Sequence, residues 1–348
     1  MIKNSDKAFL NVLRGSAITT IVLIHLGLSW FYLPYSSYIM TTVPLFFFIS
    51  GAVSYSSFLR DKSSAQNLYK RIIAIAIPYY LVLFSAFIFT WLLNRDIPTF
   101  DIMSIINWLT FNVSAERESM PLPYGQVWFL HTLFFIYIIA IPYFVWVNKK
   151  PTRLLYLMFF SIFLTLLQQS FDIAAQFNFF SHNLYSPLSN LCFFIFGAFV
   201  FTKREIFNSK IFATLSIFTF LAAYFLKDYL NLETDLNQHT AYPDLFYILS
   251  SFAVISLILL LQGVITKIIS ISSYLEKFIL FMNKHTFSIY LIHALVLYIV
   301  HHTVIGSIEG KPWLALMKIV LVIFLTCIVS IPLTYTTNKI KNYIMIKR

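Results

Sequence analysis

Apolar residues along this chain gather in long runs that short polar stretches separate. A helix that crosses a bilayer needs about 20 apolar residues. On that criterion the pattern predicts ten spans, at residues 8–33, 38–58, 72–93, 126–147, 154–171, 187–202, 210–226, 244–266, 286–305 and 313–335. The short runs that begin at residues 187 and 210 also fit a re-entrant pair, which would leave eight spans. The chain is therefore predicted to be all-α, a polytopic transmembrane helix bundle.

Composition supports this class, since 59% of the residues are hydrophobic and 11% are charged, whereas soluble domains carry about 25% charged residues. Cys192 and Cys327 both fall inside predicted spans, so they indicate neither a disulfide framework nor a metal site. No linker or soluble appended segment interrupts the pattern. We expect a single membrane domain over residues 1–348.

Charge placement predicts the orientation. With a cytoplasmic N-terminus, 20 of the 25 Lys and Arg residues lie in inner segments, as the positive-inside rule requires. This bias appears only if all ten spans are counted, so both termini are predicted to be cytoplasmic in a multi-pass protein of the cell (plasma) membrane. The net charge of +11 then reflects topology, and we expect the lipid bilayer, and no nucleic acid, as a partner.

Two polar side chains interrupt the first apolar run, Arg14 and His25 in "RGSAITTIVLIH". A cation inside the bilayer is expensive and needs compensation. Their spacing corresponds to about three helical turns, which places them about 16 Å apart on nearly one face. Arg14 snorkelling to the interface, with His25 hydrogen-bonded to a neighbouring helix, is one interpretation. The other is a path along which a phosphate-bearing ligand enters from the cytoplasm and reaches His25.

Five strings occur in order along the chain: "RGSAITTIVLIH", "VPLFFFISGAV", "KRIIAIAIPYYL", "VWFLHTLFFIY" and "FSIYLIHALVLY". Together they resemble acyltransferase family 3, bacterial membrane enzymes that move an acyl group from cytoplasmic acyl-CoA to carbohydrate outside. The resemblance covers nearly the whole chain, and "LLQQSF" and "FFIFGAF" are most similar to the branch associated with poly-N-acetylglucosamine adhesin synthesis. It implies that His25 is the catalytic base and Arg14 the essential arginine.

The chain departs from the family at the third span, where a further arginine often precedes the proline and this sequence has only Ile73 to Ile77 before Pro78. Lys70 and Arg71 are therefore expected to bind the phosphates of CoA together with Arg14. The alternative is that Arg153 and Lys284 also contribute to this binding.

These residue types suit acyl transfer. Histidine has an ordinary pKa of about 6.5 and can take a hydroxyl proton, and the guanidinium fork of arginine binds two phosphate oxygens. We expect acyl-CoA, with acetyl-CoA first and a succinyl group as the alternative, and no metal. Transfer is expected to be direct. Ser50 is the intramembrane candidate for a covalent acyl-enzyme, although a small serine at a helix contact explains it more simply.

The acceptor should bind on the outer side, close to His25. The candidates are Trp128, His131, Gln168 and Gln169, with Trp30, Tyr32, Tyr35, Tyr124 and Asn190 as further planar or aromatic groups. Boundary aromatics usually form a belt. Glu116, Glu118 and Asp172 are alternatives for orienting His25. His293 is expected to hydrogen-bond a neighbouring helix, and no role is assigned to His301 and His302.

Two functions compete on this evidence. The first is an O-acyltransferase acting on an extracytoplasmic polysaccharide or glycolipid, with glycan-synthesis machinery as a candidate partner. The second is a transporter or flippase for a polysaccharide or a lipid-linked glycan. A transporter would be expected to carry carboxylates near the membrane midplane, and the predicted spans contain Asp or Glu only near their edges. The pattern favours the enzyme and leaves the acyl group, the sugar and the oligomeric state open.

Overall fold

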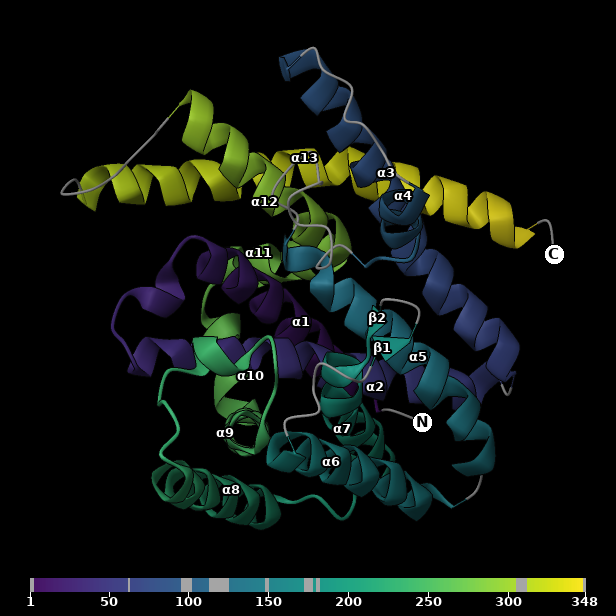
Figure 1. Ribbon diagram of the computed structural model, residues 1–348, viewed down its shortest axis with the longest axis vertical. Coiled ribbons are helices and arrows are strands. Elements are labelled where there is room, and N and C mark those ends of the chain that lie inside the picture. Colours follow the sequence, from purple (N-terminus) through teal and green to yellow (C-terminus); the bar gives the residue numbers. More distant parts are fainter. Residues whose placement is uncertain are drawn as a thin grey trace. The chain divides into compact units, whose positions relative to one another are not determined.

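The computed structural model describes residues 3–61, 63–94, 102–112, 125–147, 150–171, 178–179, 182–304 and 312–346 (Figure 1). Its α-helices are α1 (Asn4–His25), α2 (Thr42–Asp61), α3 (Ser64–Asn94), α4 (Ile102–Leu109), α5 (Trp128–Val147), α6 (Leu154–Phe171), α7 (Tyr185–Thr202), α8 (Ser209–Leu230), α9 (Leu245–Leu260), α10 (Gln262–Ile271), α11 (Ser273–Lys284), α12 (Thr286–Thr303) and α13 (Pro312–Ile346).

The remaining elements are short. The 3-10 helices are η1 (Leu28–Trp30), η2 (Tyr35–Thr41), η4 (Gly125–Val127), η5 (Pro151–Arg153) and η7 (Leu236–His239). Two antiparallel two-residue strands, β1 (Asn178–Phe179) and β2 (His182–Asn183), pair with each other. The predicted all-α class is confirmed.

Within the described residues, nine helices are long and apolar enough to cross a membrane, or ten if α9 and α10 form one broken span. The polytopic bundle predicted from the apolar runs is therefore confirmed. The runs at 187 and 210 form two separate helices, α7 and α8, and each is long and apolar enough to span a membrane, which favours two spans over a re-entrant pair. The break lies instead between α9 and α10, which meet at an angle of 62°.

The ends of the first span differ from the sequence prediction. The α1 helix stops at His25, eight residues before the predicted end. The reason is Gly27, whose φ of 99° belongs to the left-handed region that glycine adopts without strain and that ends helices. The segment that follows His25 therefore contains two 3-10 turns, η1 and η2, rather than more of the spanning helix.

The described chain divides into two compact units, which we describe separately. The first comprises Met1–Leu68 and Phe135–Asn283, and the second Tyr69–Phe134 and Lys284–Arg348. In the first unit α2 packs along α7, α7 also packs against α6, and α1 lies against α2. The helices α8 and α9 of the same unit run side by side (Figure 1). In the second unit α12 packs against α13.

The helices α2 and α7 meet backbone to backbone. A methyl group added at Gly51 would lie 1.7 Å from the carbonyl oxygen of Phe194, and one added at Gly197 would lie 1.9 Å from that of Phe48. Only glycine fits at either position. Small residues drive helix association in membranes because lipid gives no hydrophobic force between helices, so that close packing must supply the attraction.

In the second unit polar contacts join the helices. The hydroxyl of Tyr290 on α12 donates to the carbonyl oxygen of Gln126, just before α5. Between α12 and α13, the hydroxyl of Thr334 donates to Ser288 Oγ at 2.7 Å and lies 2.8 Å from His285 Nδ1. These buried groups satisfy one another, as polar atoms in a membrane bundle must.

We predict that Gly51→Ala and Gly197→Ala each lower the free energy of unfolding by about 1–3 kcal/mol, because the added methyl group forces the two backbones apart. Thermal unfolding of the protein in detergent measures this loss. Gly263→Ala on α10 is the control, since nothing lies within 4 Å of its added methyl group, and it should leave stability unchanged or slightly raised. Equal unfolding temperatures for all three variants would contradict the backbone contact.

Candidate active site

Both polar residues of the first span lie on one uninterrupted helix. The α1 helix runs from Asn4 to His25, so the spacing of Arg14 and His25 amounts to a rise of about 16 Å and about three turns. Arg14 is half-buried and His25, the last residue of the helix, is exposed. An exposed imidazole at the end of a spanning helix can accept a proton from a group outside the helix, while Arg14 provides a fixed cation deeper in the span.

The contact of α1 with α11 fixes the backbone next to Arg14. A methyl group added at Gly15 would lie 2.1 Å from the carbonyl oxygen of Ile279. The two helix backbones therefore touch one residue away from the candidate anchor. This contact holds the backbone of Arg14 in place.

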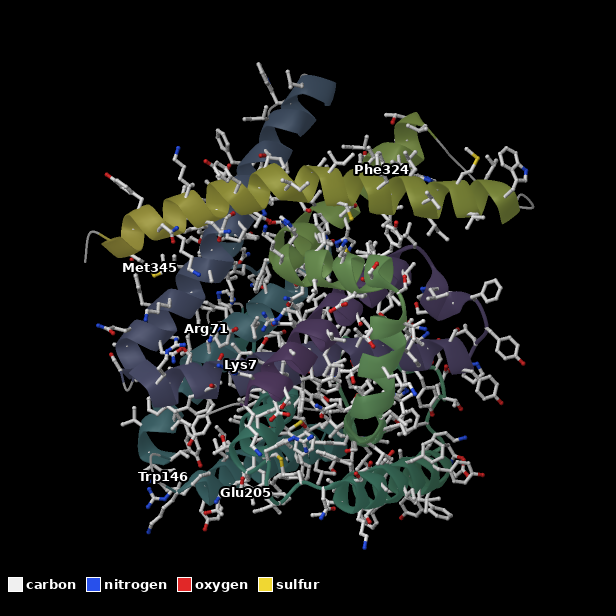
Figure 2. The ribbon with its side chains drawn as sticks, turned by 180° about the vertical axis from the view of Figure 1, so that it is seen from behind. Lys7, Arg71, Trp146, Glu205, Phe324 and Met345 are labelled. Atoms are coloured by element: carbon white, nitrogen blue, oxygen red, sulfur yellow. The ribbon has the colours of Figure 1, made fainter. Side chains whose placement is uncertain are left out.

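A buried ion pair anchors the N-terminal end of α1. Arg204 Nε lies 3.5 Å from Oδ1 of Asp6, whose side chain is buried. The same guanidinium donates to the carbonyl oxygen of Phe207 at 2.7 Å and to Gln262 Oε1 at 2.8 Å. Arg204 thus joins α1 to the turn after α7 and to the bend between α9 and α10. Figure 2 labels Lys7 and Glu205, which directly follow Asp6 and Arg204 in the sequence.

The sequence placed Arg204 only among the inner positive charges, and no local pattern connects it to Asp6. Arg153, which the sequence suggested as a helper in phosphate binding, is also held within the protein. Its Nη1 donates to the carbonyl oxygen of Trp146 at 2.6 Å, and its guanidinium lies 4.5 Å from the centre of that indole ring. Trp146 is labelled in Figure 2. Arg153 therefore has a structural role at the turn between α5 and α6.

The candidate phosphate-binding residues Lys70 and Arg71 lie near the start of α3, in the second unit, and are half-buried. Lys341 lies within electrostatic reach of both. It is brought there because α13 continues to Ile346, beyond the predicted end of its span. The structure therefore adds a third cation to this group, one that sequence reasoning had counted only as an inner charge.

Trp128 and His131 both belong to the first turns of α5, in the second unit. Trp128 is half-buried and His131 is buried. The ring of Phe129, between them, lies 5.5 Å from that of Tyr290 on α12. Tyr290 is also near His293, whose Nδ1 lies 3.1 Å from the carbonyl oxygen of Ile289 in the same helix. This end of α5 is thus a cluster of aromatic and imidazole groups.

The two adjacent glutamines of α6, in the first unit, have different surroundings. Gln169 Oε1 accepts a hydrogen bond from the backbone N–H of Leu245 at 3.2 Å, which satisfies the start of α9. Gln168 is 1% exposed, and neither atom of its amide has a hydrogen-bond partner among the described residues. A buried polar group without a partner costs about 1–3 kcal/mol. Gln168 therefore has unused hydrogen-bonding capacity in the interior.

Other candidates divide between described and undescribed parts of the chain. Glu116, Glu118, Asp172 and Tyr124 lie outside the described residues. Ser50 is half-buried beside Gly51, at the contact of α2 with α7. His301 Nδ1 lies 2.8 Å from the ammonium group of Lys318, and the ring of His302 lies 4.2 Å from that of Tyr298.

A histidine between α8 and α9, not selected from the sequence, has two acceptors around its ring. His239 Nε2 lies 3.0 Å from the carbonyl oxygen of Glu233, and its Nδ1 lies 2.7 Å from Asp244 Oδ2. Both contacts require an N–H, so the imidazolium is the form that fits. Burial lowers the pKa of His239, but the hydrogen bond and negative charge of Asp244 outweigh burial and raise it. Asp244 also accepts from the N–H of Tyr247 at the start of α9.

Comparison with known proteins adds one finding. The acyltransferase family 3 model, described as an acyltransferase domain, matches residues 7–335. The match contains every candidate site residue named above except Lys341. No curated protein and no solved structure matches the chain.

We predict that Arg204→Ala lowers the free energy of unfolding by about 2–4 kcal/mol, because it leaves the Asp6 carboxylate buried without its partner. Lys203→Ala is the neighbouring control. Its partner Glu205 is an exposed carboxylate 3.8 Å away, and such pairs contribute at most about 1 kcal/mol. Denaturant or thermal unfolding measures both. In the double variant with Asp6→Asn, part of the loss should be recovered, and a fully additive result would contradict the pairing.

We also predict that stability falls at alkaline pH through His239. Because its pKa is raised above the ordinary 6.5, the His239–Asp244 pair stabilises the fold fully below about pH 6.5 and loses that contribution as pH rises through the folded-state pKa. The unfolding temperature measured from about pH 6 to about pH 9 should show this fall. His239→Gln should lower the temperature at about pH 6 and flatten the profile. An unchanged profile in His239→Gln would show that another group titrates.

Proposed function

The chain belongs to acyltransferase family 3, and we propose that it is an O-acyltransferase that moves an acyl group from cytoplasmic acyl-CoA to a hydroxyl of an extracytoplasmic polysaccharide or glycolipid. Acetyl is the proposed group, with succinyl as the alternative. The observation that carries the proposal is α1, which presents Arg14 and His25 on one unbroken helix inside the matched region.

In this mechanism His25 is the general base. Its imidazole takes the proton of the acceptor hydroxyl as the oxygen attacks the thioester carbonyl carbon. The carbon–sulfur bond breaks, and the imidazolium returns the proton to the departing CoA thiolate. Acyl ester and free CoA are then the products, and His25 is neutral again. A positioned base of this kind contributes about 10²–10⁴-fold in rate.

The length of α1 suits a donor that reaches from one side of the membrane toward the other. Its 22 residues extend about 33 Å, which matches the hydrocarbon core of about 30 Å. Arg14 would bind the phosphate side of acyl-CoA, and the extended pantetheine arm would carry the thioester toward His25. Within the second unit, Lys70 and Arg71, now with Lys341, are proposed as phosphate-binding residues.

For the acceptor we propose Gln168, because its buried amide has free donors and an acceptor that hydroxyl groups can satisfy. Gln169 uses its oxygen for α9 and retains only its amide N–H groups for a ligand. Trp128 and His131, which belong to the second unit, are proposed as acceptor-binding residues in their own right. Poly-N-acetylglucosamine is the proposed acceptor for the family branch that the chain resembles, with its synthesis machinery as a partner.

The competing function is a transporter or flippase. In the described spanning helices, the acidic residues are confined to the first or last turn, at Asp6, Asp61 and Asp228. Coupled transporters characteristically carry ionisable groups within the membrane. The distribution of carboxylates therefore favours the enzyme.

We predict that His25→Ala and Arg14→Ala reduce acylation of the surface glycan at least about 100-fold, with unchanged protein levels in the membrane. Acyl-group analysis of glycan from expressing cells, with immunoblots of the membranes, tests this. Arg14→Lys should retain part of the activity with a raised KM for acyl-CoA, because it keeps the charge but loses the guanidinium fork. The exposed His302→Ala is the control and should acylate normally. Unchanged acylation with reduced glycan export would instead identify a transporter.

A further inference from the structure

The segment that directly follows His25 has a fixed conformation. It contains η1, a turn at residues 31–34 and η2, and the side chains of Ser29 and Ser37 are fully buried. The hydroxyl of Ser36 donates to the carbonyl oxygen of Ser29 at 2.9 Å and accepts from the N–H of Tyr32 at 3.1 Å. These bonds tie the two turns to each other.

A distant loop of the same unit holds this segment. The N–H of Leu236 donates to Ser37 Oγ at 2.9 Å, and Nδ2 of Asn237 donates to the carbonyl oxygen of Ser29 at 3.3 Å. Both residues belong to η7, the turn that the His239–Asp244 pair stabilises. The hydroxyl of Tyr247, on α9, adds a bond to the carbonyl oxygen of Met40 at 3.3 Å. The chain after His25 is therefore held by tertiary contacts and not only by its own turns.

This fixed segment displays aromatic side chains. Trp30, Tyr32 and Tyr35 are 58%, 67% and 68% exposed. The rings of Tyr32 and Tyr35 stack with centroids 5.6 Å apart and planes 21° apart. Belt aromatics anchor a helix end individually, and nothing in that role requires a stacked pair on a loop fixed by buried serines.

We propose that Trp30, Tyr32 and Tyr35 form the docking platform for the carbohydrate acceptor beside His25. This inference rests on the proposed function, since it places the acceptor of that reaction. Sugar rings have C–H faces that pack on aromatic rings, and their hydroxyls can bond the indole N–H and phenol O–H at the ring edges. Asn237 of η7 joins this segment at the carbonyl oxygen of Ser29, the residue before Trp30. The three aromatic residues lie five to ten residues after His25 in the sequence, and on this proposal a sugar bound to them brings its hydroxyl to the base.

The test is a kinetic separation of the two substrates. The purified full-length protein in lipid nanodiscs receives labelled acetyl-CoA or succinyl-CoA, and unacylated surface polysaccharide extracted from cells that lack the protein. Trp30→Ala, Tyr32→Ala and Tyr35→Ala should each raise the KM for polysaccharide at least about fivefold, as truncation of an aromatic anchor does. The KM for acyl-CoA and kcat at saturating polysaccharide should stay within about twofold.

Trp313→Ala is the matched control, because Trp313 is 60% exposed at the start of α13 and fits a belt position. It should leave the KM for polysaccharide unchanged. Any variant with a lowered unfolding temperature is replaced by Trp30→Leu, Tyr32→Leu or Tyr35→Leu, which keep bulk and lose the aromatic face.

The outcomes are distinguishable. In one outcome the wild-type protein transfers label, but the KM for polysaccharide of the variants is unchanged or rises only as much as in Trp313→Ala. This result overturns the platform and leaves the acyltransferase function standing. Variants that change kcat or the KM for acyl-CoA alone also overturn it. A wild-type protein that transfers label from neither donor overturns the proposed function, and the platform with it.

Discussion

The contact between the backbones of α2 and α7 at Gly51 and Gly197 is the constraint on which the first unit depends. The lipid around such a helix pair is as apolar as the helices themselves. Only close packing and polar contacts therefore hold the two helices together. From α7 the connection continues to α6, where the hydroxyl of Thr165 bonds that of Ser189 at 3.0 Å. Gln169 then joins α6 to the start of α9.

The same sequence of contacts reaches the candidate base. The start of α9 and η7 share the His239–Asp244 pair, and η7 holds the segment that follows His25. At its other end α1 is tied to Arg204 through Asp6, and beside Arg14 it touches α11 at Gly15. Catalytic groups need positions accurate to a fraction of an ångström. Support at both ends and in the middle is what makes a single helix suitable for carrying an anchor and a base.

Polar groups inside both units follow one rule of membrane proteins, namely that each needs a local partner because water is absent. Lys318 has His301 as a hydrogen-bonding partner, and Thr334 joins His285 to Ser288. Gln168 is one of several buried side chains among the described residues that depart from this rule, and both atoms of its amide lack a protein partner. A buried polar group without a protein partner is a favourable place for a sugar hydroxyl or a water molecule to bind, because either can supply the missing hydrogen bond.

The sequence by itself determined the helices and the spacing of Arg14 and His25, because both follow from short-range rules. A bilayer demands apolar runs of a certain length with every backbone group satisfied inside the helix, and two residues on one helix are separated by its fixed rise. Only the tertiary structure decided that Gly51 meets Phe194, that Arg204 pairs with Asp6, and that η7 holds Ser29 and Ser37. These partners are about 140 to 210 residues apart, and uniformly apolar helices carry little polar pattern to show which faces meet.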